Sequence, residues 1–237
     1  MSRLRHLSVG LALVSSVFLG GATVSYYEES LPTSMNPLFA RSMVDFRTHE
    51  LIFDRLFYRS AITNEIRSRL VKDNGAKVQR NDEARSFKIW LNDGIKWHDG
   101  QAFGAKDVCF TINAMLNTRT PSQIAKQYRE SIEACKANKD NSVEITFRKV
   151  YHNPRDRLGF SVLPAHAFSS TAVSPDTDFS VRPIGTGSMK GSKGRREVLF
   201  KKILNSHHNA RISTLSMNEG GDPYVQVRTL VNSGVQG

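Results

Sequence analysis

The sequence predicts an α/β fold, and three stretches carry this prediction. Residues 87–115 have the pattern of a strand, a turn, a short second strand, another turn and a helix. Residues 142–148 alternate apolar and polar side chains with the period of two that is typical of a strand. Residues 42–58 have apolar side chains that fit one face of a helix and charged side chains that fit another. Strands and helices are therefore expected to be mixed along the chain.

The N-terminus has the pattern of an export signal. A short positive region with Arg3 and Arg5 precedes an apolar, small-residue run at 7–21. This run is too short and too rich in Ser and Gly for a good membrane-spanning helix, which needs about 20 apolar residues. A buried N-terminal helix is the alternative, but no polar face interrupts the run. We expect residues 1–22 to be cleaved, and because the first cysteine is Cys109, we expect no lipid anchor.

After this signal, residues 23–28 predict a strand and residues 32–37 a loop. The helical pattern at 42–58 follows. Residues 70–79 begin a region of short strands, in which Asn74-Gly75 is a dipeptide typical of hairpin turns.

The stretch at 87–115 starts with a half-buried strand, since Phe87, Ile89 and Leu91 alternate with neighbours that face the other way. Asp93-Gly94 and Asp99-Gly100 are turn signals, because glycine accepts a positive φ without steric cost. The short strand between these turns is expected to place its tryptophan in a core.

A helix is expected after the second turn. Apolar side chains recur at helical spacing from Ala105 to Met115, and Lys106 and Asp107 are expected to face water. Further along, residues 124–135 predict a helix or the entry into a strand, and residues 160–163 predict a strand that ends at a proline.

Composition indicates a globular protein. The 237 residues are 39% hydrophobic and 23% charged, enough for one domain or two small ones. The formal net charge of +11 would suit nucleic acid or anionic lipid, but the Lys and Arg residues are scattered singly except at 190–196 and 201–202. No zinc-finger spacing, RNA-binding aromatic motif or basic heptad accompanies them. We therefore expect a solvated basic surface and no nucleic-acid partner.

Motifs for nucleotide binding and catalysis are missing from the sequence. Gly185-Thr186-Gly187 would need a glycine at position 190 to match a dinucleotide fingerprint, and Lys190 stands there. No Walker A, G-x-S-x-G, H-E-x-x-H or C-x-x-C pattern occurs. The sequence thus gives no sign of an enzyme or of a cofactor, and we expect neither.

The histidines suggest no metal centre. His98 lies between Trp97 and Asp99 and is expected to be a turn residue, because it has no companions at ligand spacing. His207 and His208 are adjacent, and adjacent side chains are expected to point to different sides. A shared metal would need a ligand from elsewhere, so no metal is predicted.

Cys109 and Cys135 are the only cysteines. In an oxidising compartment they can form a disulfide, and the alternative is two buried free thiols that pack as small apolar side chains. The export signal favours the disulfide.

Several segments resemble a known family in the order in which that family has them. The longest is DGIKWHDGQAFGAKDVCFTINAM at 93–115; the others are MNPLFA (35–40), LIFDRLFY (51–58), VEITF (143–147), VLPAHAF (162–168) and PIGTG (183–187). Together they resemble the family-5 solute-binding proteins, the peptide-, dipeptide- and nickel-binding receptors of bacterial ABC importers. The resemblance runs from Val24 onward and reaches about the first half of a family member.

This resemblance implies a truncated form of the type II periplasmic-binding-protein fold. Residues 23–53 and 164–237 would form the main lobe, and residues 54–163 an inserted subdomain packed on it. The second lobe would be absent, together with the acidic anchor for the peptide α-amino group. A helical pattern at 225–231 lies near the end of the chain.

The resemblance also implies a ligand-binding region in two loops. The matching positions are Arg41, Ser42 and Met43 after the Asn-Pro pair, and Ile184, Gly185 and Thr186 in PIGTG. Arg41 could equally be a surface charge, and Met43 a core filler. Ser188-Met189 stands where the family usually has Pro-Tyr, which weakens a binding role for the second loop.

The function implied is the substrate-binding component of an ABC importer for oligopeptides or dipeptides. Its partners would be a peptide, a membrane permease and an ATPase, and it would be a periplasmic monomer. One alternative is a truncated remnant or interaction module that transports nothing. Another is the same receptor class with nickel or sugar as cargo.

Overall fold

The computed structural model describes residues 23–83, 85–204, 206–208 and 210–220. The α-helices in this part are α1 (Met43–Ile52), α2 (Ala105–Leu116) and α3 (Gln123–Arg129). The strands are β1 (Thr23–Glu28), β2 (Tyr58–Arg59), β3 (Ile66–Arg67), β4 (Val78–Asn81), β5 (Ser86–Trp90), β6 (Ile132–Ala137), β7 (Ser142–Phe147), β8 (Met189–Lys193), β9 (Glu197–Lys202) and β10 (Thr214–Glu219). Short 3-10 helices lie at Pro37–Phe39, Lys72–Gly75, Pro154–Arg157, Ala165–Ala167 and Asp178–Ser180. The fold is α/β, as the sequence predicts.

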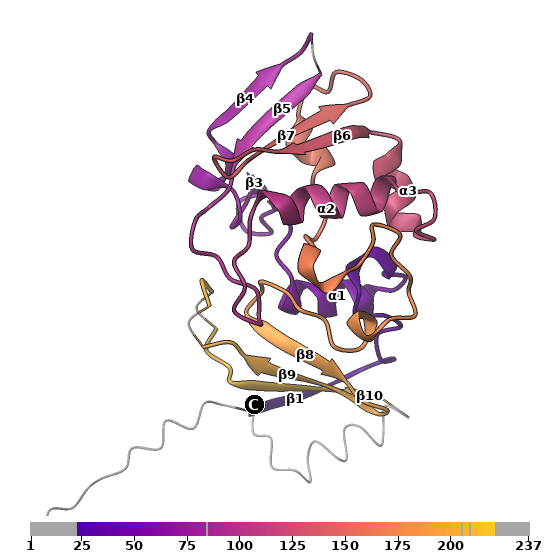
Figure 1. Ribbon diagram of the computed structural model, residues 1–237. Coiled ribbons are helices and arrows are strands. Elements are labelled where there is room, and N and C mark those ends of the chain that lie inside the picture. Colours follow the sequence, from indigo (N-terminus) through magenta and orange to yellow (C-terminus); the bar gives the residue numbers. More distant parts are fainter. Residues whose placement is uncertain (1–22, 84, 205, 209, 221–237) are drawn as a thin grey trace, which may run out of the picture.

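The strands assemble into two larger sheets that lie at opposite ends of the described molecule, with α1 and α2 between them (Figure 1). The first sheet has the order β1-β10-β9-β8, and the second has the order β4-β5-β7-β6. β2 and β3 form a separate antiparallel pair. α1 packs against β8 of the first sheet, and α2 packs against β6 and β7 of the second.

The first sheet joins distant parts of the chain. β1 pairs in parallel with β10, with Thr23 opposite Thr214, while β9 runs antiparallel to both β10 and β8. Its strands thus come from the segments predicted to form the main lobe, and the second sheet lies wholly within residues 54–163. The domain boundaries themselves stay a prediction.

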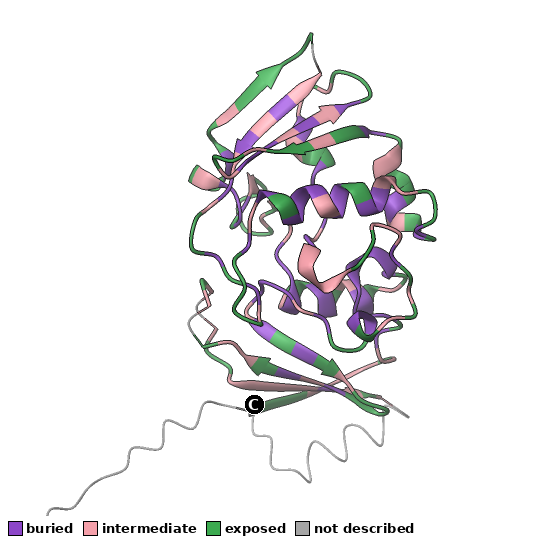
Figure 2. Ribbon diagram, viewed as in Figure 1, coloured by how far each residue is buried: buried purple, intermediate pink, exposed green. Residues whose placement is uncertain are grey.

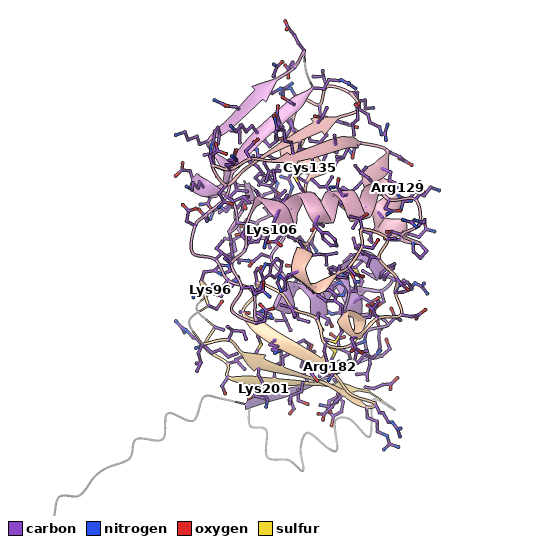
Figure 3. All side chains as sticks on the ribbon, viewed as in Figure 1. Lys96, Lys106, Arg129, Cys135, Arg182 and Lys201 are labelled. Carbon is purple, nitrogen blue, oxygen red and sulfur yellow. A yellow bond between two sulfur atoms is a disulfide. The ribbon has the colours of Figure 1, made fainter. Side chains whose placement is uncertain are left out.

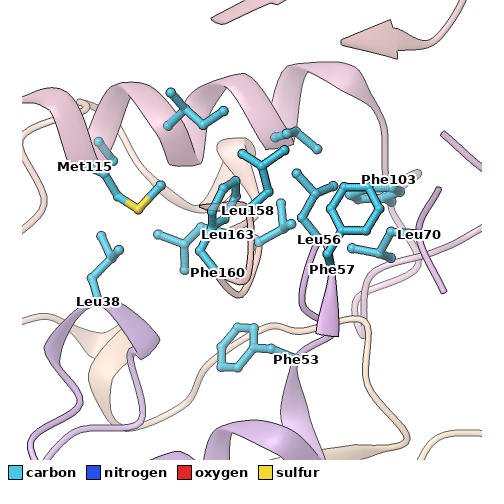
Figure 4. Packing of buried hydrophobic residues seen from close by; sticks show 14 of the residues in the cluster. Leu38, Phe53, Leu56, Phe57, Leu70, Phe103, Met115, Leu158, Phe160 and Leu163 are labelled. Carbon is cyan, nitrogen blue, oxygen red and sulfur yellow. The ribbon is translucent and has the colours of Figure 1, made fainter. Parts of the chain in front are cut away.

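Buried apolar side chains form a continuous cluster between the sheets. Figure 4 shows Leu56, Phe57, Leu158 and Phe160 packed beneath α2, which contributes Met115 from above. The buried stretches in Figure 2 continue from this cluster into the strands of both sheets. Both sheets therefore rest on one shared apolar core.

The predicted strand at 23–28 is β1, and the segment 124–135 contains both a helix, α3, and the start of a strand, β6. Gly94 and Gly100 have φ values of +77° and +88°, which confirms the two Asp-Gly turns. At 142–148 the alternation predicts β7, whose Val143, Ile145 and Phe147 are buried.

Three local predictions are wrong in extent or type. α1 ends at Ile52 and does not continue to residue 58, because the backbone turns extended there and the N–H of Leu56 donates to the Phe160 carbonyl at 2.9 Å. Residues 95–97 and 160–163 make only isolated bridges, Lys96 with Ala102 and Arg55 with Ser161. The pairing of these segments does not extend into a ladder.

Asn74-Gly75 does not close a hairpin. Asn74 and Gly75 do have positive φ, at 55° and 76°, but they lie inside the 3-10 helix at Lys72–Gly75. The flanking strands β3 and β4 pair with β2 and β5, not with each other.

Asp107 does not face water as predicted; its exposed fraction is 0%, whereas Lys106 is exposed. Its Oδ2 accepts the N–H of Gly104 at 2.9 Å and the indole N–H of Trp97 at 3.3 Å. Its Oδ1 accepts the N–H of Ala165 at 2.9 Å. The carboxylate is buried because it satisfies backbone donors at the start of α2 that would otherwise lack partners.

Basic residues are dispersed over the molecule. The lysines and arginines labelled in Figure 3 belong to different elements and loops at both ends of the described chain. No helix in the described residues is long and apolar enough to cross a membrane. The predicted export signal at 1–22 and the helical pattern at 225–231 lie outside the described residues.

Cys109 of α2 and Cys135 of β6 are joined as a disulfide, with 5.3 Å between their Cα atoms. The bond ties the helix to the edge strand of the second sheet. Thiol titration under denaturing, non-reducing conditions is expected to find no free thiol, and two after reduction. Reduction should lower the free energy of unfolding by ~3 kcal/mol, because the closed loop restricts the unfolded chain. Two free thiols before reduction would contradict the pairing.

His49 of α1 predicts a loss of stability in mild acid. Its ring is buried and its Nε2 lies 2.9 Å from the Ser34 carbonyl. Burial is the main cause that lowers the pKa of His49 to about 4 from its ordinary value of 6.5, although Ser34 and Asp45 act in the opposite direction. Between pH 6.5 and 4 the histidine is protonated in the unfolded chain but stays neutral in the folded chain. The free energy of unfolding should therefore fall as the pH drops from 6.5 towards 4.

The loss is expected to be about 2–3 kcal/mol, since each pKa unit corresponds to about 1.4 kcal/mol. Urea unfolding of the wild type and of His49→Gln at pH 7.5 and pH 4.5 measures it. His152→Gln, at an exposed histidine, is the control. An equal pH dependence in the wild type and His49→Gln would contradict the assignment.

Candidate functional site

The six predicted ligand-binding residues fall into two groups at opposite ends of α1. Arg41, Ser42 and Met43 lie at its N-terminus. Residues 184–186 lie against its C-terminal end, where the N–H of Gly187 donates to the Ile52 carbonyl at 2.8 Å. A helix of this length spans about 15 Å, so the structure does not bring the two groups together.

The first group is held by a capping box at the start of α1. The N–H of Asp45 donates to Ser42 Oγ at 3.1 Å, and Asp45 Oδ2 accepts the N–H of Ser42 at 3.0 Å. The N–H of Arg41 also donates to Oδ2, at 2.7 Å, and Thr33 donates through both its N–H and its hydroxyl. Burial opposes ionisation, but these donors hold the pKa of Asp45 below its ordinary value. This end of α1 is therefore a rigid, polar platform.

The side chains on this platform point outward. Met43 is 64% exposed, so the alternative that it fills the core is wrong. Arg41 is exposed as well. Both side chains are free to contact a ligand or a further part of a protein.

Thr33, which bonds to Asp45, also lines a hollow of about 620 Å³. Its lining carries charges of both signs, with Asp176 and Asp178 on one segment and Lys193 and Arg195 on another. A lining of this kind suits a zwitterionic or polar ligand. None of the six predicted residues lines it.

The second group is packed inside the protein. Thr186 is 3% exposed and Gly185 is buried, and only Ile184 is partly exposed. A Cβ atom on Gly185 would lie 1.8 Å from the Ile52 carbonyl oxygen. This loop therefore fixes the end of α1 to the first sheet. Of the three predicted residues, only Thr186 lines a cavity in the described part of the chain, and this cavity lies beside His98 and His207.

His98 fastens the same loop from the other side. Its N–H donates to the Gly185 carbonyl at 2.9 Å, and its Nδ1 accepts the N–H of Gly185 at 3.2 Å. Its Nε2, 3.0 Å from the Gly187 carbonyl, must then carry the proton and donate it. Burial is the main cause that lowers the pKa of His98, which keeps the ring neutral. His98 thus has a structural role close to the turn role expected.

Asp54, two residues after α1, is the centre of a buried polar network. Its Oδ2 lies 2.9 Å from His207 Nε2 and 3.0 Å from His208 Nε2. The Thr186 hydroxyl donates to the same oxygen at 2.9 Å. The Asp54 side chain is 2% exposed, whereas those of His207 and His208 are 24% and 13% exposed.

This network keeps Asp54 ionised in spite of its burial. Burial favours the neutral acid, but the hydrogen bonds and charge interactions of His207 and His208 outweigh it and hold the pKa of Asp54 well below its ordinary value. Arg69 adds an ion pair, with 3.5 Å between Nη1 and Asp54 Oδ1.

The sequence does not reveal this network. The two imidazole rings reach the same oxygen, so the expectation that adjacent histidines point to different sides is wrong. That expectation holds for a strand, but His207 and His208 lie in a bend, where the His208 N–H donates to Ser206 Oγ at 3.2 Å. The third member, Asp54, is far away in the sequence, so no local spacing could have marked it.

Comparison with protein families gives a match over more than half of the chain. The family model described as bacterial extracellular solute-binding proteins, family 5, middle, matches residues 67–202. A Brucella ovis protein that bears the name of an ABC transporter peptide-binding protein is 32% identical over 102 residues, which are 41% of this chain and 19% of that protein. Protein XP55 of Streptomyces lividans is 27% identical over 107 residues, 45% of this chain and 19% of that protein. The matched part thus spans about a fifth of these relatives.

Solved structures resemble this one over most of the chain. NikZ from Campylobacter jejuni, in complex with Ni(L-His), superposes with a TM-score of 0.75 at 25% identity, over 89% of this chain and 42% of that one. The oligopeptide-binding protein AppA from Bacillus subtilis, in complex with a nonapeptide, gives a TM-score of 0.78 at 17% identity, over 90% and 43%. The chain therefore has the fold of less than half of each of these proteins.

Proposed function

The chain belongs to family 5 of the bacterial extracellular solute-binding proteins, and we propose that it serves as the solute-binding component of an ABC importer whose cargo is a peptide. The observation that carries the proposal is the family match over residues 67–202. The Brucella ovis relative, named for peptide binding, and AppA, solved with a nonapeptide, support a peptide cargo. The partners proposed are a membrane permease and an ATPase.

We propose that the outer face of α1 and the hollow beside it form one wall of the peptide site. Arg41 and Met43 are exposed on a platform that the Asp45 network holds rigid. The hollow presents carboxylates and cations within one lining, which suits the charged groups of a peptide. Ile184, Gly185 and Thr186 act in this proposal as the support of α1 and not as ligand contacts.

The matched structures are more than twice as long as this chain, so we propose that the 237 residues alone bind a peptide weakly. A ligand held from one side keeps much of its surface in water, whereas a typical small-molecule site buries 70–90% of it. Binding to the 237-residue chain is expected at about 1 mM or weaker. The protein is proposed to be exported to the periplasm and to act as a monomer, with residues 23–53 and 164–237 in one lobe and 54–163 as its subdomain.

Nickel is the alternative cargo, because NikZ was solved with Ni(L-His). The other candidate, a non-transporting interaction module, predicts no saturable ligand binding at all. Sugar cargo has no specific observation in its favour. One labelling experiment separates these possibilities.

Photo-cross-linking with di- to pentapeptides that carry a benzophenone group tests the peptide proposal on the 237-residue chain. Labelling is expected to saturate in the millimolar range and to map to residues 33–43 and to the hollow. Unlabelled peptides should compete, whereas Ni(L-His) and oligosaccharides should not. Arg41→Ala should weaken labelling several-fold, and Arg119→Ala, which removes an exposed charge from another loop, should leave it unchanged.

Labelling that does not saturate, or that only Ni(L-His) suppresses, would contradict a peptide cargo. Micromolar binding by calorimetry would contradict the proposal that these residues hold a peptide weakly.

A further inference from the structure

The network around Asp54 has the composition and geometry of a metal centre. Asp54 Oδ2, His207 Nε2 and His208 Nε2 all lie within 4.8 Å of one another. Two imidazole nitrogens and one carboxylate oxygen are the donor atoms that Zn²⁺ takes in sites that keep a fourth position open. The network is separate from the peptide wall proposed above, because it lies at the other end of α1.

The distances already suit an ion. Zn²⁺ binds histidine nitrogen at about 2.0–2.1 Å and carboxylate oxygen at about 2.0–2.2 Å, so tetrahedral ligand atoms lie about 3.3 Å apart. The two nitrogens are 2.9 and 3.0 Å from the oxygen, held there by hydrogen bonds. Both N–O distances are thus within about 0.4 Å of the spacing in a tetrahedral site, and the two nitrogens lie within 4.8 Å of each other.

The carboxylate is fixed before any ion arrives. The backbone carbonyl of Asp54 accepts the N–H of Val162 at 3.2 Å, and the backbone N–H of Asp54 donates to Thr186 Oγ1 at 3.3 Å. The Thr186 hydroxyl in turn donates to Oδ2. Such outer contacts orient a ligand and raise metal affinity in known sites. Thr186, predicted to touch a solute, would thus act on the carboxylate.

A cavity lies beside His207, one of the three candidate ligands. His207 lines a cavity of about 250 Å³, together with Trp97, His98 and Thr186. This space is large enough for water molecules as further ligands. Apart from the two histidines, Arg69 is the one basic side chain in ion-pair contact with Asp54 among the described residues, and it approaches Oδ1, not Oδ2.

We propose that Asp54, His207 and His208 bind one divalent transition-metal ion of the Zn²⁺ class. The ion would replace the hydrogen bonds between the two histidines and the carboxylate, and each imidazole would carry its remaining proton on Nδ1. It would fasten the loop after β9 to the end of α1. This proposal does not depend on the peptide function, since it concerns other residues and another ligand.

Calorimetry of the chelator-treated 237-residue chain with ZnCl₂ tests the site. One equivalent of Zn²⁺ is expected to bind and to raise the melting temperature, because a ligand of the folded state stabilises it. Co²⁺ as a probe should give the visible absorption of a four-coordinate site. Zn²⁺ should abolish this absorption by competition.

His207→Ala and His208→Ala are each expected to weaken Zn²⁺ binding at least about 100-fold, since loss of an outer contact alone costs 10–100-fold. His166→Ala is the matched control, because it removes one histidine from a different carboxylate pair, with 2.7 Å between His166 Nε2 and Asp99 Oδ2. It should leave binding unchanged. Asp54→Asn should weaken binding as well, and circular dichroism checks that this buried variant folds.

Two results would overturn the proposal. One is that the wild-type chain binds no stoichiometric Zn²⁺. The other is that His207→Ala and His208→Ala, both folded by circular dichroism, bind Zn²⁺ as tightly as the wild type and His166→Ala do.

Discussion

Trp97→Ala is expected to lower the free energy of unfolding by about 3–5 kcal/mol, the usual cost of removing a buried tryptophan. Trp97 is 2% exposed, and its ring meets Phe103 and His166 edge to face, with centroids 5.9 and 6.3 Å away. Its indole N–H donates to the buried carboxylate of Asp107. The substitution would therefore leave both a cavity and a buried acceptor with one partner fewer.

Urea unfolding followed by far-ultraviolet circular dichroism measures this effect. Trp90→Ala is the matched control, since Trp90 is the other tryptophan and is only partly buried, with Lys88 Nζ 5.1 Å from its ring centre. The loss for Trp90→Ala should be clearly smaller. A loss below ~0.5 kcal/mol for Trp97→Ala, the size usual for a surface substitution, would mean that Trp97 is not part of the core.

Gly185→Ala is expected to destabilise by at least about 3 kcal/mol, the upper end of the usual cost of overpacking. The new Cβ would lie 1.8 Å from the Ile52 carbonyl oxygen and 2.7 Å from its carbon. These are backbone atoms, so no side-chain rotation relieves the overlap. The loop would have to move away from α1 and lose its hydrogen bonds to His98.

Gly159→Ala is the control for this substitution. A Cβ there would lie 3.7 Å from the Phe57 carbonyl oxygen, which is an ordinary contact. Its effect should be small, and thermal melting of both variants compares them. Equal melting temperatures for Gly185→Ala and the wild type would show that the loop is not packed as described.

Local patterns in the sequence predicted part of the secondary structure, but not β8, β9 and β10 of the first sheet. The alternation at 142–148 and the helical spacing after Ala105 depend only on neighbouring residues, and β7 and α2 lie where these patterns predict them. The Asp-Gly dipeptides also predicted the turns at Gly94 and Gly100, because the positive φ of a turn depends on the glycine itself. The family resemblance was likewise readable from the longest motif, at 93–115.

Contacts between distant segments were not predictable in this way. Asp107 has a polar side chain at a position that looks exposed, but Ala165 and Trp97 surround it. α1 ends at Ile52 because the following residues pair with the segment around Phe160. The sequence carries no spacing that reports either contact.

In the candidate site, too, local motifs were predictable from the sequence and contacts between distant residues were not. Arg41, Ser42 and Met43 were predicted from a motif, and the structure places them on an exposed helix end, where a binding role stays a proposal. Gly185 and Thr186 belong to a recognisable motif too, but both are buried. Gly185 packs against the Ile52 carbonyl, and the Thr186 hydroxyl donates to Asp54, so the motif has a role in packing. Asp54 could be identified only once the fold brought it to His207 and His208.

The parallel pairing of β1 with β10 sets an order of events during folding. The paired residues Thr23 and Thr214 are roughly 190 positions apart, so forming this pair closes a very long loop and is slow. The second sheet draws all its strands from residues 78–147 and needs no such closure. We therefore expect the second sheet and α2 to form while β1 still lacks its partner. β1, the first strand in the order of the chain, would then be among the last strands to pair.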